Sequence, residues 1–370
     1  MKEVIDLPAE EARLYADFCE LLVEHRLQAE ALEDVWRRLA QSRHTRQSRP
    51  GSEGQITLLY GPTGVGKTAL WDACMERCRA LHRQRGLPGR LPYLYTLCDV
   101  PSTGIWQMKP FYAATLAAAD EVLIKHKQLI KPATSVQTSW HATTAGLRQA
   151  TLNMLKHREP PIFCIDEAHH LGIHSSDEQK EKNLDAIKTF ADEASVPILM
   201  LGSYELIDFQ SRSGRLGRRA RPIHLPRYNI ENGADQLEFK SVVYFFKKRL
   251  PQDGFDLYNE FPMFMEQTLG CVGLLKQWLE RAYFTALWSG RRAVRRRDIQ
   301  DEAPTPDLVN QWLDEINAGE TRLREHGISA SRMPSKSKGK RKSQSHAKKP
   351  FQRSKLADPV GTARATKVAA

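Results

Sequence analysis

Apolar residues recur at steps of three and four near the start of the chain, and this spacing predicts a helix over residues 9–40. Pro8 directly precedes it and suits a first helical turn. The stretch Gln41–Gly54 that follows is polar and basic and contains Gly and Pro. We therefore expect a linker there.

From residue 56 onward, short apolar runs alternate with helical patterns. We expect strands at Ile56–Tyr60, Leu91–Leu97, Pro161–Ile165, Pro197–Leu201 and Pro222–Leu225, and helices at Thr68–Arg83, Phe111–Lys127, Ser139–His157 and Glu178–Ala194. Strands that alternate with helices are typical of a parallel sheet covered on both faces. The pattern thus predicts an α/β fold.

After Leu225 the strand signals stop, and the pattern becomes helical at Gly233–Leu250, Phe261–Leu269, Val272–Trp288 and Thr305–Arg324. From Ser329 the chain is rich in Ser, Lys and Arg, which predicts disorder because little apolar surface is available to bury. We divide the chain into an N-terminal helical segment and linker (1–50), an α/β domain (51–226), a helical lid and C-terminal helices (227–328) and a disordered basic tail (329–370).

Charge is distributed unevenly between this tail and the rest of the chain. The formal net charge is +11. From residue 332 onward there are twelve Lys or Arg and one acid, a difference of +11, so the preceding part is neutral overall. The six cysteines are scattered, with Cys74 and Cys78 on one apolar helix face, which favours buried thiols over a metal site. The acidic start lacks an apolar signal region and no apolar run reaches membrane-spanning length. We expect a cytoplasmic protein without a membrane partner.

The strand at Ile56–Tyr60 leads into a glycine-rich loop, which a helix follows. Its sequence matches G-x-x-x-x-G-K-[ST], the phosphate-binding P-loop, with Gly61, Pro62, Thr63, Gly64, Val65, Gly66, Lys67 and Thr68. The backbone N–H groups of such a loop surround the phosphates, and the following helix N-terminus adds positive potential. Lys67 would contact the β- and γ-phosphates and Thr68 would bind magnesium. The sequence predicts ATP and Mg²⁺ as ligands.

A second motif ends the predicted buried strand near residue 165. Asp166 and Glu167 follow an apolar run, at the strand end where α/β sheets place ligand chemistry. We expect Asp166 to hold magnesium and Glu167 to orient and deprotonate the attacking water. His169 and His170 come next. They could sense the γ-phosphate or contact a neighbour, but a structural role at a helix start is the preferred interpretation.

Three further features follow these motifs. Ser203 stands at the end of the next strand, where it would contact the γ-phosphate or the water, or would only begin a turn. A cluster of arginines precedes Pro222 and is either a solvated basic loop or the source of an arginine finger for a neighbouring subunit. Lys276 begins a helix of the second lobe, from where it could contact the γ-phosphate.

The order of these motifs resembles that of the AAA+ ATPases over about residues 40–300, and within them the transposition regulators TnsC and TniB. The resemblance rests on GPTGVGKT, IDEAHH, ILMLGSYEL, GRLGRRARPIHL and GCVGLLK. It implies an AAA+ module with a helical lid, with Ser203 as sensor 1 and Lys276 as sensor 2. It also implies Arg219, or else Arg218, as the arginine finger. The long interval from Lys67 to Asp166 departs from a compact AAA+ module and predicts an insertion in residues 99–135.

The resemblance implies a function as well. Such proteins form ATP-dependent rings or filaments on double-stranded DNA, receive a signal from a TniQ-type target selector and recruit the transposase. DNA contacts should go to phosphates, so binding would be independent of sequence and sensitive to salt. By position we expect them between the second strand and Asp166, where Lys109, Lys125, Lys127 and Lys131 lie, although ordinary surface lysines are the alternative.

Three other functions remain to be weighed. A replication loader or initiator would need a winged-helix module after the lid, and residues 300–330 are too short for one. A helicase, suggested by the letters DEAH at Asp166–His169, would need a second α/β domain where this chain is helical. A nucleotide-switched signalling or scaffold protein would bind ATP but hydrolyse it little.

Overall fold

Five parallel strands form the central sheet of the computed structural model. They are β1 (Ile56–Tyr60), β2 (Leu94–Leu97), β3 (Phe163–Asp166), β4 (Ile198–Gly202) and β5 (Ala220–His224), in the spatial order β2-β3-β4-β1-β5. All four pairings are parallel, with Leu58 opposite Met200 and Pro222. The α/β class and the parallel sheet predicted from the alternating pattern are therefore confirmed.

The structure describes residues 6–48, 56–86, 88–99, 106–127, 142–172, 176–194, 196–208 and 220–326. All of them belong to one compact unit, Met1–Arg332. The predicted disordered tail, Lys131 and the arginines at positions 212, 215, 218 and 219 lie outside the described residues.

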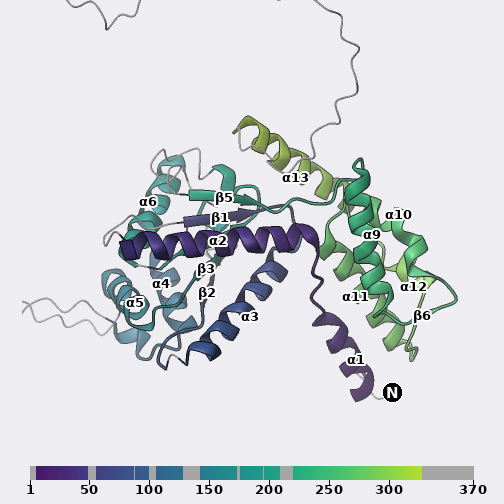
Figure 1. Cartoon of the computed structure of the whole chain (residues 1–370), viewed down its shortest axis with the longest axis horizontal. Coiled ribbons are helices and arrows are strands. Elements are labelled where there is room, and N and C mark those ends of the chain that lie inside the picture. Colours follow the sequence, from purple (N-terminus) through teal and green to yellow (C-terminus); the bar gives the residue numbers. More distant parts are fainter. Residues whose placement is uncertain are drawn as a thin grey trace, which may run out of the picture. The chain divides into compact units, whose positions relative to one another are not determined.

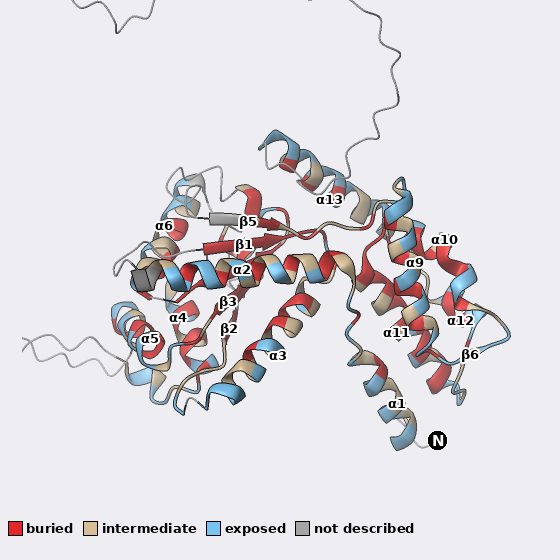
Figure 2. Ribbon diagram, in the orientation of Figure 1, coloured by how far each residue is buried: buried red, intermediate tan, exposed pale blue. Residues whose placement is uncertain are grey.

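Helices cover both faces of the sheet because side chains alternate along each strand. Leu59 and Leu199 face one side with α2 (Arg26–Ser48) and α3 (Lys67–Arg85), whereas Leu58 and Met200 face the other. That second side is covered by α4 (Met108–Ala118), α5 (Thr144–Arg158) and α6 (Asp177–Ala194). Figure 1 shows α2 crossing the strands on the near side, and Figure 2 shows that β1 is buried.

The second lobe is helical, as predicted. It contains α9 (Gly233–Lys247), α10 (Phe261–Gln267), α11 (Val272–Trp288) and α12 (Arg296–Asp301), with the short parallel pair β6 (Gln252–Asp253) and β7 (Val294–Arg295). Trp278 of α11 is fully buried, and its indole N–H donates to the carbonyl of Ile299 in α12. The sequence pattern missed α12 and the two short strands. Helix α13 (Pro306–Glu325) follows, with Thr305 as its N-cap.

The prediction of one helix over residues 9–40 is wrong. The structure has α1 (Ala9–Cys19), a break and then α2. Helix α1 packs on α11 of the second lobe, while α2 packs on α3 and β5. One straight helix cannot reach both surfaces. His25 in the break contacts the hydroxyl of Tyr228 through Nδ1 at 3.1 Å, which fixes the turn.

Other boundaries also differ from the prediction. The linker expected at Gln41–Gly54 is helical as far as Ser48, because α2 continues along the sheet and Ser42 is buried there. The helix expected at Phe111–Lys127 ends at Ala118, and a one-turn 3-10 helix, η1 (Ile124–His126), follows. No helix among the described residues is long and apolar enough to cross a membrane.

Candidate nucleotide site

The P-loop connects β1 to α3 at the carboxyl edge of the sheet. Gly64 and Gly66 have φ values of 71° and 106°, in the region that favours glycine. A Cβ on Gly61 would overlap the carbonyl oxygen of Leu225, so this position also requires glycine. The loop therefore needs glycine at each of its three glycine positions, as expected for a backbone that wraps around phosphates.

Lys67 begins α3 and its side chain folds back over the loop. Its Nζ donates to the carbonyl oxygens of Gly61 and Pro62 at 2.9 and 3.0 Å. Burial lowers the pKa of Lys67, while the nearby carboxylates of Glu167, Glu315 and Asp166 raise it in part. The ammonium group is thus close enough to these carboxylates to feel their charge, and a bound phosphate would supply further negative charge.

Asp166 ends β3 and is 7% exposed. Its Oδ1 accepts from the backbone N–H of Glu167 at 2.8 Å, and its Oδ2 accepts from the hydroxyl of Tyr95 at 3.0 Å. Tyr95 lies on the neighbouring strand β2 and stacks on Trp71 of α3. Burial, followed by the charge of Asp166, raises the pKa of the Tyr95 phenol, which therefore remains a donor. Sequence analysis did not identify Tyr95 as part of this site.

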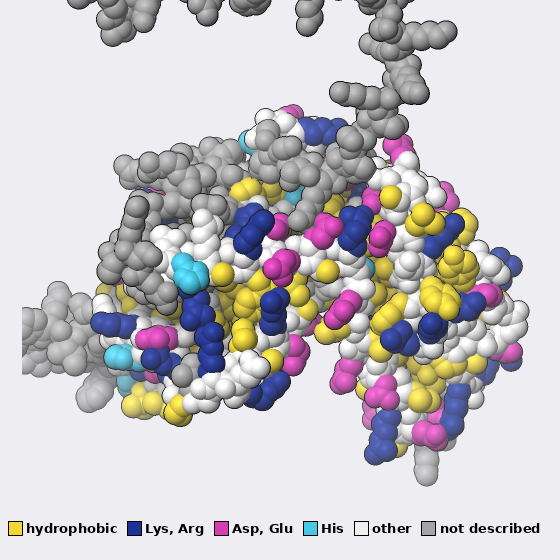
Figure 3. All heavy atoms as spheres, in the orientation of Figure 1, with side chains coloured by type: hydrophobic (Ala, Val, Ile, Leu, Met, Phe, Trp, Pro, Cys, Tyr) yellow, Lys and Arg dark blue, Asp and Glu magenta, His cyan; other side chains and the backbone are white. Residues whose placement is uncertain are grey.

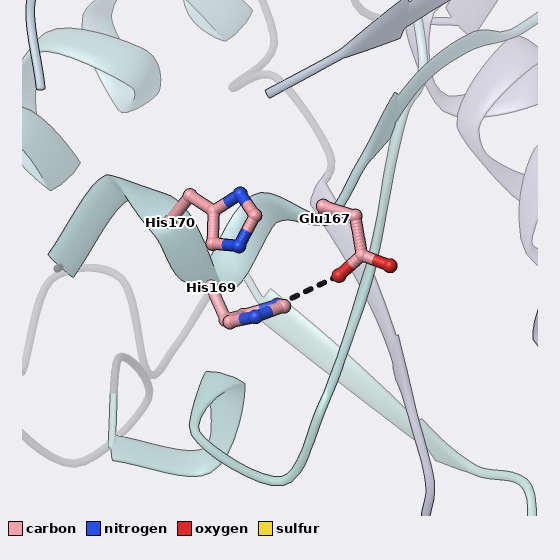
Figure 4. Close-up of side chains that lie close together, drawn as sticks. All are labelled: Glu167, His169 and His170. Atoms are coloured by element: carbon pink, nitrogen blue, oxygen red, sulfur yellow. Dashed lines mark ion pairs between the residues drawn. The ribbon is translucent and has the colours of Figure 1, made fainter. Parts of the chain in front are cut away.

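Glu167 directly follows the strand with a φ of 50°. This left-handed conformation is uncommon outside glycine, and it is often retained at functional sites. Its carboxylate oxygen Oε2 lies 3.1 Å from Nδ1 of His169, as Figure 4 shows. The side chain is 43% exposed, so it points toward solvent while Asp166 is buried.

The two histidines have different partners. His170 contacts the carbonyl oxygen of Cys98 through Nδ1 at 2.7 Å, and so joins the segment after β3 to the end of β2. Burial, and then the charge of His170, lowers the pKa of His169 and favours its neutral form. Glu167, His169 and His170 lie close enough to hold a metal ion, with ligand atoms within 4.8 Å of one another. His169 contacts Glu167, the predicted base. The sequence pattern favours only a structural role for His169.

The structure gives Ser203 and Lys276 local partners. Ser203 directly follows β4 at the expected edge, and its hydroxyl accepts from the backbone N–H of Glu205 at 3.4 Å. Lys276 donates to the carbonyl oxygen of Cys19 at 2.6 Å and pairs with Glu280 at 3.4 Å. It therefore caps the end of α1, and a contact with a γ-phosphate would require both interactions to break. Both sensor roles remain predictions.

The remaining predicted positions are described only in part. Lys109 and Lys125 are exposed, whereas Lys127 pairs with Glu121 at 3.5 Å. Lys131, Arg218 and Arg219 lie outside the described residues.

The second lobe contacts the P-loop through α11. The backbone N–H of Leu274 donates to the carbonyl oxygen of Gly64 at 3.1 Å. A Cβ on Gly273 would lie 2.5 Å from the same oxygen, so only glycine allows this approach. The lobe is therefore attached directly to the loop that would carry the phosphates.

Helix α13 contacts the P-loop as well. Glu315 accepts hydrogen bonds from the backbone N–H and the hydroxyl of Thr63, at 3.3 and 2.8 Å through the same oxygen, Oε1. No sequence motif marks Glu315.

Residues 46–209 match the family model described as an AAA domain. The chain contains an AAA domain. The β2-β3-β4-β1-β5 sheet and the helical second lobe complete an AAA+ fold. The P-loop and the Asp166–Glu167 pair both lie within the matched part of the AAA domain, whereas α13 lies outside it.

One solved structure, with a TM-score above 0.5, shares this fold. The Aeropyrum pernix ORC2 protein in its ADPNP-ADP complexes is 11% identical, with a TM-score of 0.52, and the match covers 85% of this chain and 90% of that one. The ADP form of the same protein gives 14% identity and a TM-score of 0.48 over 82% and 72% of the two chains. Aeropyrum pernix ORC1 in complex with DNA gives 16% and 0.48 over 76% and 65%. At such identities the likeness is one of fold. No curated protein matches the chain.

Proposed function

We propose that this chain is an ATPase that hydrolyses ATP to ADP and phosphate at the P-loop. The observation that supports this best is that the P-loop after β1 and the Asp166–Glu167 pair at the end of β3 meet at the same edge of the parallel sheet. The loop supplies N–H donors and a cation for phosphates, and the neighbouring strand end supplies one buried and one solvent-facing carboxylate.

The residues present fit ATP and magnesium. Gly64 and Gly66 adopt the positive φ values that turn backbone N–H groups inward, and the buried carboxylate of Asp166 is a hard oxygen ligand. Thr68 and Asp166 would hold Mg²⁺, which would neutralise charge on the phosphates. Lys67 would bind the β- and γ-phosphates. Glu167 would accept a proton from the attacking water.

The wider role that we propose is that of a transposition regulator, which oligomerises on target DNA and connects a TniQ-type selector to the transposase. The motif order and the basic sequence after residue 332 support this role. On the face shown in Figure 3, Lys and Arg side chains lie among Asp and Glu. That face does not suggest a single basic patch. The candidate DNA contacts are still Lys109, Lys125, Lys127 and Lys131. Arg219, or else Arg218, would act on the ATP of a neighbouring subunit.

The ATPase proposal is tested with Lys67→Ala and Glu167→Gln. The first should abolish ATP binding, and the second should keep binding but lower turnover by about a hundredfold or more, because the water loses its base. Glu181→Gln, an exposed position of α6, is the matched control and should leave turnover unchanged. Equal turnover of Glu167→Gln and the original protein would refute the mechanism and favour a switch or scaffold protein.

The role on DNA is tested by negative-stain microscopy with a non-hydrolysable ATP analogue, with and without random duplex DNA. Rings or filaments that need both ligands support the regulator. Particles that stay monomeric in both conditions contradict it. Selection of one sequence from a random DNA library would instead favour a replication initiator, because a regulator that contacts phosphates should show no sequence preference.

A further inference from the structure

Helix α13 is held against the AAA domain along one face. Ile316 and Leu323 are buried, at 1% and 3% exposure, and Gly319 between them packs on the ring of Tyr204. Glu320 on the same face pairs with Arg227 at 3.1 Å. These positions recur at steps of three and four, so a single helix face makes all the contacts.

Glu315 lies at the edge of this face and reaches the P-loop. Its Oε1 accepts from both donors of Thr63. Its negative charge also raises the pKa of Lys67, which burial lowers. Of the nearby carboxylates, only Glu167 raises that pKa more. One carboxylate of α13 therefore accepts from a loop N–H, and its charge raises the pKa of the loop lysine.

The same two groups are those that a P-loop offers to phosphate. The backbone N–H groups of the loop surround the phosphates, and the lysine contacts the β- and γ-phosphates. A carboxylate and a triphosphate are both anions, and they repel each other when they lie close together. Glu315 and ATP thus use overlapping groups and disfavour each other by charge.

We propose that Glu315 is a residue of the nucleotide site that competes with the terminal phosphates of ATP, so that α13 is docked without ATP and displaced when ATP binds. The inference rests on the proposed ATP binding. It goes beyond that function, because it makes the position of α13 depend on the nucleotide.

The geometry supports displacement of the helix rather than of one side chain. Glu315 is adjacent to the buried Ile316, so its backbone is held close to the loop. A ligand that repels the carboxylate therefore acts on the helix as a whole. Its other contacts are those of Trp312, Ile316, Gly319 and Leu323 and the pairs of Glu320 with Arg227 and of Arg322 with Asp208. Loss of α13 from this surface would leave the sheet and its pairings intact.

The test compares the affinity for a non-hydrolysable ATP analogue between the original full chain and Glu315→Gln, Glu315→Ala, Asp314→Asn and Lys67→Ala. Removal of the competing charge should tighten binding about tenfold in both Glu315 variants. Asp314 is exposed at the adjacent position of α13, so Asp314→Asn makes the same charge change away from the loop and should leave affinity unchanged. Unchanged or weaker binding by both Glu315 variants would overturn the inference.

A second measurement follows the helix itself by hydrogen exchange of the α13 amides. In the original protein the analogue should speed their exchange, whereas in Lys67→Ala it should have no effect. Unchanged or slower exchange on saturation with the analogue would show that α13 stays docked, and would overturn the proposal. If the original protein binds no analogue at all, then the proposed ATPase function fails first, and the two failures are thus distinguished.

Discussion

The contact between Gly319 and Tyr204 predicts the direction in which Gly319→Ala changes the docking of α13. A Cβ on Gly319 would overlap the ring of Tyr204, with Cε2 at 2.6 Å and two other ring carbons closer. The ring cannot move away easily, because it is 3% exposed and its hydroxyl contacts Nε2 of His224 at 3.2 Å. It also packs against the ring of Tyr60.

Two opposing terms set the size of the effect of Gly319→Ala. Alanine favours a helix interior over glycine by about 1 kcal/mol. Overpacking of a tight contact costs about 1–3 kcal/mol. The net effect should weaken docking of α13 by up to about 2 kcal/mol, and every 1.4 kcal/mol is about tenfold in the open population. Because α13 is the last described element, we expect local opening while the sheet stays folded.

Hydrogen exchange measures this opening. The amides of α13 should exchange up to about thirtyfold faster in Gly319→Ala, while those of β1 and β4 keep their protection. Asn317→Ala is the matched control, since Asn317 is exposed on the same helix and the change brings only the better helix propensity, which should slow exchange slightly. Slower exchange in both variants would show that only helix propensity acts, and would refute docking of Gly319 on Tyr204.

Three further predictions concern the site and its surroundings. Tyr95→Phe keeps the ring on Trp71 but removes the hydrogen bond to Asp166, so turnover should fall about three- to tenfold with a higher Mg²⁺ requirement, measured by magnesium titration of ATPase activity. His169→Ala should lower kcat about tenfold at unchanged KM, because the ring only orients Glu167; a rise in KM alone would contradict that role. Burial lowers the pKa of His224 from 6.5 to about 4 in the folded protein. As the pH falls, the unfolded protein therefore takes up a proton at His224 before the folded protein does. Stability should therefore be complete above pH 6.5 and fall toward pH 4, and urea unfolding of His224→Gln should show a weaker fall.

The sequence predicts the parts of this protein that depend on local pattern. The P-loop and the Asp166–Glu167 pair each follow a short apolar run, and parallel strands bring their carboxyl ends to one edge. The parallel pairing of β1 and of β3 with β4 then places both motifs at the same edge without any further signal. The apolar spacing predicts a helix over Val272–Trp288, and the structure has the same bounds.

The contacts that α13 makes with the P-loop have no signal in the local sequence pattern. The amphipathic pattern at residues 305–324 predicts a helix but does not say which surface the helix covers. Glu315 meets Thr63 across 252 residues of sequence, and the pairing depends on Ile316, Gly319 and Leu323 finding the AAA domain together. Lys276 illustrates the same limit in reverse. Its order among the motifs predicts a sensor, yet in the structure its charge lies at the end of α1. Helix α1 can pack on the second lobe only because the chain breaks between α1 and α2. Control of the P-loop by distant helices is thus a property of tertiary packing, and the variants of Glu315 and Gly319 test it without altering the motifs themselves.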